Sequence, residues 1–428
     1  MKRIATLGLL WVFVFGMLAT QAQSVTKKLK SLGIDSIVPL TISTNQFESA
    51  FVISFLQPVD HQNPDGEKFY QRLILRHRSF DKPVVFVTEG YDASYGLNPA
   101  FSEELSSKLD ANLLIAEHRF FGESMPEQKN WEALNLKNAT ADLHAVNQLL
   151  KEVYAAAWIS TGISKGGQTS LYYRYFYPDD VAVTVPYVAP LNFSVADKRV
   201  QHFLDTVGDT HCRKKLYDLQ YKLLNNSAIF LQCFKDSTTK RQLSFERVGG
   251  IEKAFELNVL ELGFAYWQWY PYPCNEIPDT TSTDAVLFDA WIAAAGYDFF
   301  ADQSLESMQA FFYQALTEMG FYTYETKPFK QLLTHIKKPN FEHALPSGVS
   351  VKYKNKTNRR LNKWLKKNGN NIVYIYGGFD AWSSTAVQPS SKSNAIKLVK
   401  NQGSHATRLR HFTPEEQQQV IEFIQNKI

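Results

Sequence analysis

The stretch AAWISTGISKGGQTSLYYRYFYPDD, from Ala156 to Asp180, decides the fold predicted for this chain. A short apolar run precedes a serine framed by glycines, and a helical pattern follows that ends at Pro178. The residues Gly162-Ile163-Ser164-Lys165-Gly166 fit the pattern G-x-S-x-G, in which the serine occupies a sharp turn from a strand into a helix. Neighbours with Cβ atoms would clash at such a turn, and glycines avoid the clash. The pattern therefore predicts that Ser164 is a nucleophile at the end of a strand.

The same turn predicts how an oxyanion would be stabilised. The backbone N–H of Lys165 follows the nucleophile and would point at the developing negative charge. In α/β-hydrolases a second N–H comes from the loop after an earlier buried strand. The apolar run Val84–Val87 predicts that strand, so we expect the second donor near Tyr91.

An acid and a histidine follow Ser164 in the chain order that this fold requires. Asp380 comes after the predicted strand NIVYIY (371–376), and His405 comes after the predicted strand AIKLV (395–399). We expect the His405 imidazole to remove the Ser164 proton and Asp380 to hold the imidazole in the required tautomer. The alternative interpretations are a turn-forming aspartate and a polar loop histidine.

Other histidines compete for the role of base. His411 lies near His405 and is the second candidate. His118 and His144 precede the serine, which is the wrong side for this chain order, and we interpret both as structural.

The composition is that of a globular protein. The 428 residues are 44% hydrophobic and 21% charged, with a net charge of +4. The most basic segment, KYKNKTNRRLNKWLKK (352–367), is interpreted as a solvated loop and helix face rather than a nucleic-acid site. The sequence implies no metal or organic cofactor, and it does not determine the oligomeric state.

The N-terminus has the pattern of a secretory signal peptide. Lys2 and Arg3 precede an apolar run from Ile4 to about Leu18, and we expect cleavage after Ala22. An uncleaved anchor is the alternative, although the run is short for a membrane span. We expect a secreted or periplasmic protein without stable membrane insertion after removal of the signal.

Strand and helix patterns alternate along much of the chain. The turn Asn63-Pro64-Asp65-Gly66 separates two strand-like runs and predicts a hairpin, and a helix pattern covers Asn98 to Leu109. The order of elements predicts a mostly parallel sheet covered on both faces, and therefore an α/β-hydrolase fold with an inserted helical cap. The predicted parts are the signal peptide (1–22), the first part of the hydrolase domain (23–192), the cap (193–340) and the second part of the hydrolase domain (341–428).

Export makes a disulfide possible, and the chain has three cysteines. They allow one bridge and leave one thiol. Proximity along the sequence favours Cys212–Cys233 over a pair that involves Cys274.

Two carboxylates are candidates for binding a substrate ammonium group. Glu89 lies in the loop after the Val84–Val87 strand, and Glu318 would join it if the cap folds over the site. A loop salt bridge or a helix cap is the alternative for each. Trp267, Trp269 and Phe264 could form an apolar pocket for a compact side chain, although aromatic residues of a cap are more often core.

Five stretches of the chain resemble a known family. They are QPVDHQN to FYQR (57–72), TEGYD (88–92), EHRFFGESMP (117–126), GISKGGQTS (162–170), and GGFDAWS (377–383) with the later GSH (403–405). The chain resembles the serine exopeptidases related to lysosomal Pro-X carboxypeptidase and dipeptidyl peptidase II, and most of all the secreted bacterial tripeptidyl-aminopeptidase (PS-10-type) family.

The resemblance implies a triad of Ser164, Asp380 and His405, a helical cap after Asn192, and binding of the substrate amino terminus by Glu89. The lysosomal enzymes have Gly-Gly-Ser-Tyr-Gly-Gly where this chain has Lys165, and Asp-Pro-Trp where it has Asp380-Ala381-Trp382. These differences leave proline preference and the length of the released peptide open.

The sequence therefore predicts a secreted serine exopeptidase that releases short peptides, foremost tripeptides, from peptide substrates with free N-termini. A dipeptidyl- or Pro-X carboxypeptidase-like activity and an esterase or lipase on the same fold are the enzymatic alternatives. A binding protein on an inactive hydrolase scaffold is the alternative without catalysis.

Overall fold

The computed structural model describes residues 24–34 and 36–428. The predicted signal peptide lies outside the described residues. None of the helices formed by those residues has both the length and the hydrophobicity that a bilayer-spanning helix needs.

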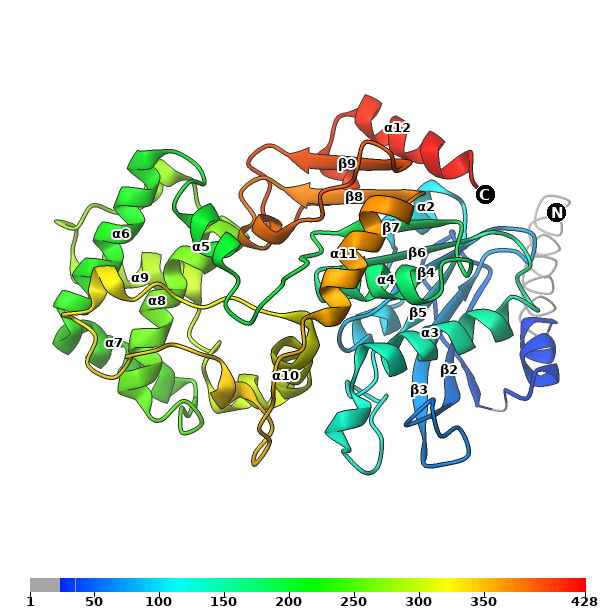
Figure 1. The fold of residues 1–428 in the computed structure, drawn as a ribbon, viewed down its shortest axis with the longest axis horizontal. Helices are drawn as coiled ribbons and strands as arrows, with labels where there is room; N and C mark the ends of the chain where they lie inside the picture. Colours follow the sequence, from blue (N-terminus) through cyan, green and yellow to red (C-terminus); the bar gives the residue numbers. More distant parts are fainter. Residues whose placement is uncertain (1–23, 35) are drawn as a thin grey trace, which may run out of the picture.

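A mixed sheet forms the core of one half of the molecule (Figure 1). Within the described residues its strand order is β1-β2-β3-β5-β4-β6-β7-β8-β9. The strands β1 to β3 and β5 pair antiparallel in turn, and every later pairing is parallel. The strands are β1 (Ile37–Pro39), β2 (Ser49–Pro58), β3 (Lys68–His77), β4 (Val84–Thr88), β5 (Asn112–Ala116), β6 (Trp158–Ile163), β7 (Val183–Tyr187), β8 (Ile372–Gly377) and β9 (Ala395–Lys400).

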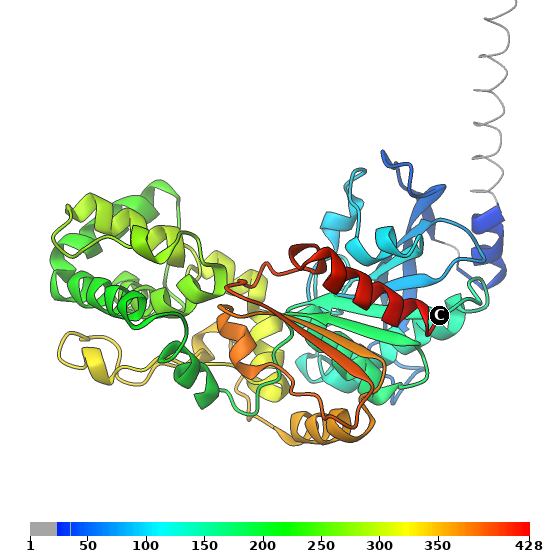
Figure 2. The ribbon, with the colours of Figure 1, turned by 90° about the horizontal axis from the view of Figure 1, so that it is seen from above.

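Helices cover both faces of this sheet. Val85 and Val87 of β4 pack in the same cluster as Val420 of α12 (Pro414–Gln425), on the face that also carries α2 (Glu104–Lys108). Val84 and Phe86 belong to the opposite cluster, which includes residues of α3 (Leu136–Leu150) and α4 (Lys165–Phe176). Successive side chains of a strand alternate between faces, so a continuous apolar run buries both. Figure 2 shows α12 on one side of the sheet and α11 (Lys356–Asn368) on the other. The predicted α/β-hydrolase fold is confirmed.

The segment between β7 and β8 is helical in the part of the chain that the structure describes. Figure 1 shows all of these helices except the last as a lobe toward which the arrowheads of β8 and β9 point, whereas the last helix lies on the sheet. The boundaries predicted for the cap, residues 193–340, stay a prediction. The helices of the segment are α5 (Lys198–Leu204), α6 (Thr210–Asn225), α7 (Ser227–Lys240), α8 (Ile251–Trp269), α9 (Asp284–Ala295) and α10 (Asp302–Gln314), with α11 following before β8.

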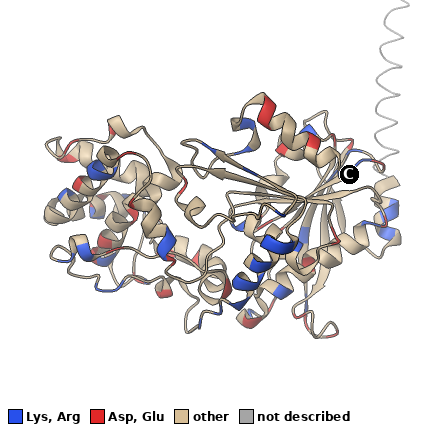
Figure 3. Cartoon of the chain, turned by 45° about the horizontal axis from the view of Figure 1, so that its top comes forward, with Lys and Arg blue, Asp and Glu red and all other residues tan. Residues whose placement is uncertain are grey.

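The basic segment lies largely on α11. Figure 3 shows lysine and arginine along this helix. Leu361 and Leu365 of this helix are fully buried, while its lysines and arginines are exposed. This is the amphipathic pattern of a helix that packs on a sheet and presents a solvated face.

Two local predictions are wrong. The predicted helix from Asn98 to Leu109 is reduced to α2, which begins at Glu104. Asn98 has an extended backbone (φ −62°, ψ 122°) because the ring of Pro99 disfavours a helical conformation in the preceding residue.

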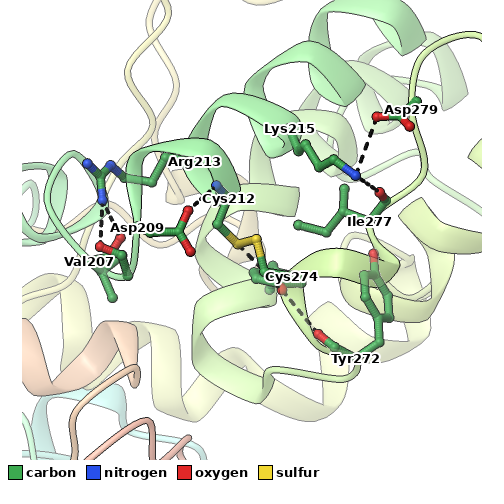
Figure 4. Close-up of a disulfide and its surroundings, with 11 residues drawn as sticks. Val207, Asp209, Cys212, Arg213, Lys215, Tyr272, Cys274, Ile277 and Asp279 are labelled. Carbon is green, nitrogen blue, oxygen red and sulfur yellow. Dashed lines mark hydrogen bonds and ion pairs between the residues drawn. A yellow bond between two sulfur atoms is a disulfide. The ribbon is translucent and has the colours of Figure 1, made fainter.

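The second wrong prediction is the disulfide. Cys212 of α6 pairs with Cys274, with 5.4 Å between the Cα atoms (Figure 4). Cys233 is not bridged. Cys212 and Cys233 lie on successive helices that meet near Asn226. At 1.5 Å per residue, Cys212 is about 20 Å from that junction and Cys233 about 10 Å. The two Cα atoms must therefore be roughly 10 Å apart or more, beyond the reach of a disulfide.

Candidate active site

Ser164 occupies the turn between β6 and α4. It is the N-cap of α4, and its backbone has φ 56° and ψ −119°. A Cβ on Gly162 would lie 2.3 Å from the carbonyl oxygen of Gly166, so the turn has no room for a side chain there. The Ser164 N–H donates to the Tyr187 carbonyl at 2.9 Å. These contacts hold the serine in a strained conformation at the carboxyl edge of the sheet.

Asp380 and His405 lie in the loops after β8 and β9. His405 Nδ1 is 2.9 Å from Asp380 Oδ2. Asp380 is fully buried and also accepts hydrogen bonds from the Trp382 N–H at 3.0 Å and the Ser383 hydroxyl at 3.1 Å. Because an ionised carboxylate only accepts, Nδ1 carries the proton and Nε2 is left with a lone pair. An imidazole in this tautomer can act as a base through Nε2.

The two loops are also joined through their backbones. The N–H groups of Phe379 and Asp380 both donate to the Gly403 carbonyl, at 2.9 and 3.2 Å. A Cβ on Gly377 would lie 2.4 Å from that carbonyl oxygen. The close contact explains the glycine at the end of β8 and fixes the distance between acid and imidazole.

Helix α8 contacts His405 and also lines a cavity of about 260 Å³. The backbone N–H of His405 donates to the Gln268 carbonyl at 2.7 Å, and the ring of Trp269 packs edge-on against the imidazole, with 5.6 Å between the ring centroids. The cavity is lined by residues that include Ser164, Lys165, Tyr91, Glu261, Trp269 and Trp382. The serine and the ring that contacts the imidazole therefore face one space.

The competing histidines have other partners. His118 Nδ1 lies 2.8 Å from the Arg119 carbonyl oxygen, and burial lowers the pKa of His118 well below its usual value. His144 pairs with Asp180 at 2.8 Å. His411 Nδ1 accepts from the Arg408 N–H at 3.0 Å. None of these three lines the cavity that contains Ser164, and neither does His405. His405 differs from them because Trp269, which lines that cavity, contacts its ring.

The loop predicted to supply the second oxyanion donor lies against the start of α4. A Cβ on Gly90 would be 2.7 Å from both the Gly166 nitrogen and Lys165 Cβ. Tyr91 lines the cavity with Ser164, and its carbonyl accepts from the His118 N–H at 3.1 Å. The Tyr91 N–H has no partner among the residues that the structure describes. It stays a predicted oxyanion donor together with the Lys165 N–H.

The segment EHRFFGESMP supports this loop. Glu117 is fully buried and accepts from the Ala93 N–H at 3.0 Å and the Ser124 hydroxyl at 2.7 Å. Arg72 pairs with both Glu117 and Asp92. A buried carboxylate is tolerated because these donors satisfy it. The segment thus has a structural function beside the cavity.

The predicted substrate carboxylates lie outside the cavity. Glu89 accepts a hydrogen bond from the Tyr95 hydroxyl, and burial raises the pKa of Glu89 to about 7, opposed by that hydrogen bond. Glu318 Oε2 accepts from the Leu136 N–H at 2.8 Å and thereby caps α3. Neither residue lines the space that Ser164 faces. Substrate binding by either residue stays a prediction, with Glu89 beside the oxyanion loop and Glu318 at the start of α3.

The predicted aromatic pocket is divided between two cavities. Trp269 lines the cavity with Ser164, whereas Trp267 and Phe264 line a separate cavity of about 560 Å³. Phe264 also stacks on Tyr322 at 3.8 Å. Residues two apart on a helix point in nearly opposite directions, which separates Trp267 from Trp269.

Sequence reasoning missed Glu261. It belongs to α8, is 4% exposed and lines the cavity that contains Ser164. Its Oε2 accepts from the hydroxyls of Tyr322 at 2.9 Å and Tyr324 at 2.6 Å, and its Oε1 has no donor in the described part of the chain. Burial raises the pKa of Glu261 to about 8. An acidic residue within the otherwise apolar helical run NVLELGFAYW was the signal that could have found it.

The comparison with protein families identifies the lineage of this site. The family model described as PS-10 peptidase S37 matches residues 21–420. The chain belongs to the PS-10 peptidase S37 family. It is therefore a serine peptidase, and the resemblance seen in the sequence is confirmed.

Two relatives found by sequence agree with this assignment. The chain is 31% identical over 372 residues to the prolyl tri/tetrapeptidyl aminopeptidase of Streptomyces mobaraensis, covering 85% of this chain and 77% of the relative. It is 29% identical over 157 residues to the human lysosomal Pro-X carboxypeptidase, covering 33% and 32% of the two chains. Among solved structures, the proline iminopeptidase of Mycobacterium smegmatis matches with a TM-score of 0.42 and 13% identity, over 87% of this chain and 98% of that one.

Proposed function

We propose that this S37 peptidase releases short peptides, foremost tripeptides, from free N-termini, with Ser164, Asp380 and His405 as its catalytic residues. His405 Nε2 accepts the Ser164 proton as Oγ attacks the scissile carbonyl carbon. The backbone N–H groups of Lys165 and Tyr91 donate hydrogen bonds to the oxyanion of the tetrahedral intermediate. Collapse expels the amine, which takes the proton from His405, and water then hydrolyses the acyl-enzyme by the same route.

The buried carboxylate of Glu261 is the observation that most supports a preference for substrates with a free amino terminus. Its carboxylate is buried in the cavity that Ser164 faces, and no cation is paired with it among the described residues. A buried carboxylate without a cation is costly, and a substrate ammonium would supply both the charge and the donors that Oε1 lacks. A C-terminal carboxylate would gain no charge pair with Glu261. This geometry favours an aminopeptidase over a Pro-X carboxypeptidase-like activity.

The name of the Streptomyces relative, a prolyl tri/tetrapeptidyl aminopeptidase, supports release of tripeptides and proline before the cut. The rings of Phe311, Phe321 and Trp382 line the same cavity. Their apolar faces suit a compact ring such as that of proline.

We also propose that the protein is exported. The Cys212–Cys274 disulfide fits an oxidising compartment, and the signal peptide predicted for residues 1–22 would direct the chain there. N-terminal sequencing of the protein from culture fractions tests this, with Gln23 as the expected first residue.

The activity is tested on purified mature protein with chromogenic tripeptide substrates. We expect release of the intact tripeptide from substrates with a free amino end and a much slower reaction after N-acetylation. Ser164→Ala is the control for contaminating peptidases. Equal cleavage of acetylated substrates would overturn the N-terminal preference, and hydrolysis of a short ester alone would leave the esterase alternative.

A further inference from the structure

The side chain of Lys165 has no part in the mechanism above, although it lies directly beside the nucleophile. The residue is 1% exposed, and its Nζ donates to the carbonyl of Gly90 at 2.5 Å. The ring centroids of Tyr91 and Phe121 lie 5.4 and 5.1 Å from Nζ. The Gly90 carbonyl is its one hydrogen-bond partner among the residues that the structure describes. Burial lowers the pKa of Lys165 well below its usual value, and either protonation state of the amine can donate this hydrogen bond.

The carbonyl that Lys165 binds belongs to the same peptide unit as the Tyr91 N–H. The described part of the chain has no cis peptide bond. In a trans peptide the C=O and the N–H are coplanar and point in opposite directions. A donor that fixes the Gly90 carbonyl therefore also fixes the direction of the Tyr91 N–H.

The flanking groups of the loop are restrained by other contacts. The Ala93 N–H donates to Glu117 at 3.0 Å, and the Tyr91 carbonyl accepts from the His118 N–H at 3.1 Å. The Gly90–Tyr91 peptide has no other described hydrogen bond to its own C=O and N–H. The amine of Lys165 is thus the restraint on the peptide that carries the predicted second oxyanion donor.

We propose that Lys165 sets both donors of the oxyanion hole, one with its own backbone N–H and the other through the Gly90 carbonyl. Its side chain is a positioning residue in this role. Hydrogen bonding to the carbonyl oxygen also polarises the peptide and strengthens the Tyr91 N–H as a donor. The inference rests on the acyl transfer at Ser164 that is proposed above, and it requires no particular peptide substrate.

Lys165→Met tests the proposal because methionine retains the length of the side chain without a donor. Loss of an oxyanion donor lowers kcat about 10²- to 10³-fold, and we expect a loss of about 10- to 100-fold from misplacing one. KM should change less than about twofold, because the side chain acts on the transition state. A Lys165 that contacts substrate would instead raise KM. Lys165→Gln, whose amide can still donate to the carbonyl, should retain more activity than the methionine variant.

A rescue experiment separates this function from a general contribution to folding. Lys165→Ala leaves space for a small amine, and ethylammonium should restore part of kcat, whereas tetramethylammonium, which has no N–H, should not. Thr169→Val is the matched control: its hydroxyl donates to the Lys165 carbonyl at 2.9 Å within α4, so its loss should lower stability without lowering kcat. An unchanged kcat in Lys165→Met, or equal rescue by both cations, would overturn the proposal.

The same variants are measured with p-nitrophenyl acetate and a fluorophosphonate probe. A wild-type enzyme that reacts with both and releases no peptide would contradict the proposed peptidase specificity only. The effect of Lys165 on the ester rate would still decide the positioning function.

Discussion

Asp380 and His405 form a buried hydrogen bond of 2.9 Å between Oδ2 and Nδ1, although 25 positions separate them in the sequence. The contact is made because β8 and β9 are parallel neighbours whose exit loops meet at Gly403. It fixes which imidazole nitrogen holds the proton.

Asp380→Asn should abolish most of the activity while leaving the fold intact. The amide can donate to Nδ1 and so stabilise the wrong tautomer, and it no longer stabilises the imidazolium. We expect a loss of about 10⁴-fold in kcat, as in other serine peptidases. Steady-state kinetics and thermal unfolding of the variant check this. A loss of less than tenfold would remove Asp380 from the triad.

Glu261→Gln should raise KM for tripeptide substrates with a free amino end. A hydrogen bond to a charged group contributes about 1.5–3 kcal/mol, so we expect an increase of about 10- to 100-fold with little change in the rate of short-ester hydrolysis.

Two matched variants accompany this measurement. Glu89→Gln tests the carboxylate that the sequence favoured, and Glu318→Gln should affect only stability because Glu318 caps α3. A larger KM effect in Glu89→Gln than in Glu261→Gln would return the ammonium site to the loop after β4.

Glu261 should also make stability depend on pH. Burial raises its pKa from 4.5 to about 8, so between these values the folded state holds a proton that the unfolded state has lost. The free energy of unfolding therefore falls as pH rises through this window, by an amount on the order of 5 kcal/mol at most. Glu261→Gln removes this contribution.

The measurement compares denaturant unfolding of the two proteins from pH 5 to pH 8. The variant should gain stability relative to wild type as pH rises. The comparison with a matched variant is needed because burial also raises the pKa values of Glu89 and Glu103, which titrate in both proteins. A difference in stability that is constant with pH would show that Glu261 titrates normally.

The features that sequence predicted well are those with local causes. The turn at Ser164 depends on glycines two residues away on either side, and Gly162 lies against Gly166 as the motif requires. The loops of Asp380 and His405 follow short apolar strands, and parallel order brings their ends together. Chain order and strand pattern are sufficient for such a prediction.

The acidic residue in an apolar helical run marks Glu261 as unusual, but its place in the cavity with Ser164 could not be predicted from the sequence because its partners are distant. Tyr322 and Tyr324 lie 61 and 63 positions further along the chain, and only packing of the segment after α10 on α8 brings them to the carboxylate. The contact of Glu318 with the start of α3, 182 positions away, could not be predicted from the sequence for the same reason. Long-range contacts of this kind leave no periodic signal.

The Cys212–Cys274 disulfide should stabilise the helical segment. The disulfide closes a loop between cysteines 62 positions apart and so lowers the conformational entropy of the unfolded chain. Native disulfides contribute about 2–4 kcal/mol to the free energy of unfolding. Cys212→Ser should therefore lower the free energy of unfolding by about this amount, and Cys233→Ser, which breaks no bridge, should lower it little. Helix α8 ends shortly before Cys274 and holds His405 through the Gln268 carbonyl, so Cys212→Ser should also inactivate faster on heating.

Denaturant titrations with and without a reducing agent check the predicted change in stability: reduction should bring the wild type to the stability of Cys212→Ser. Equal stability of the oxidised and reduced wild type would show that packing alone maintains the segment.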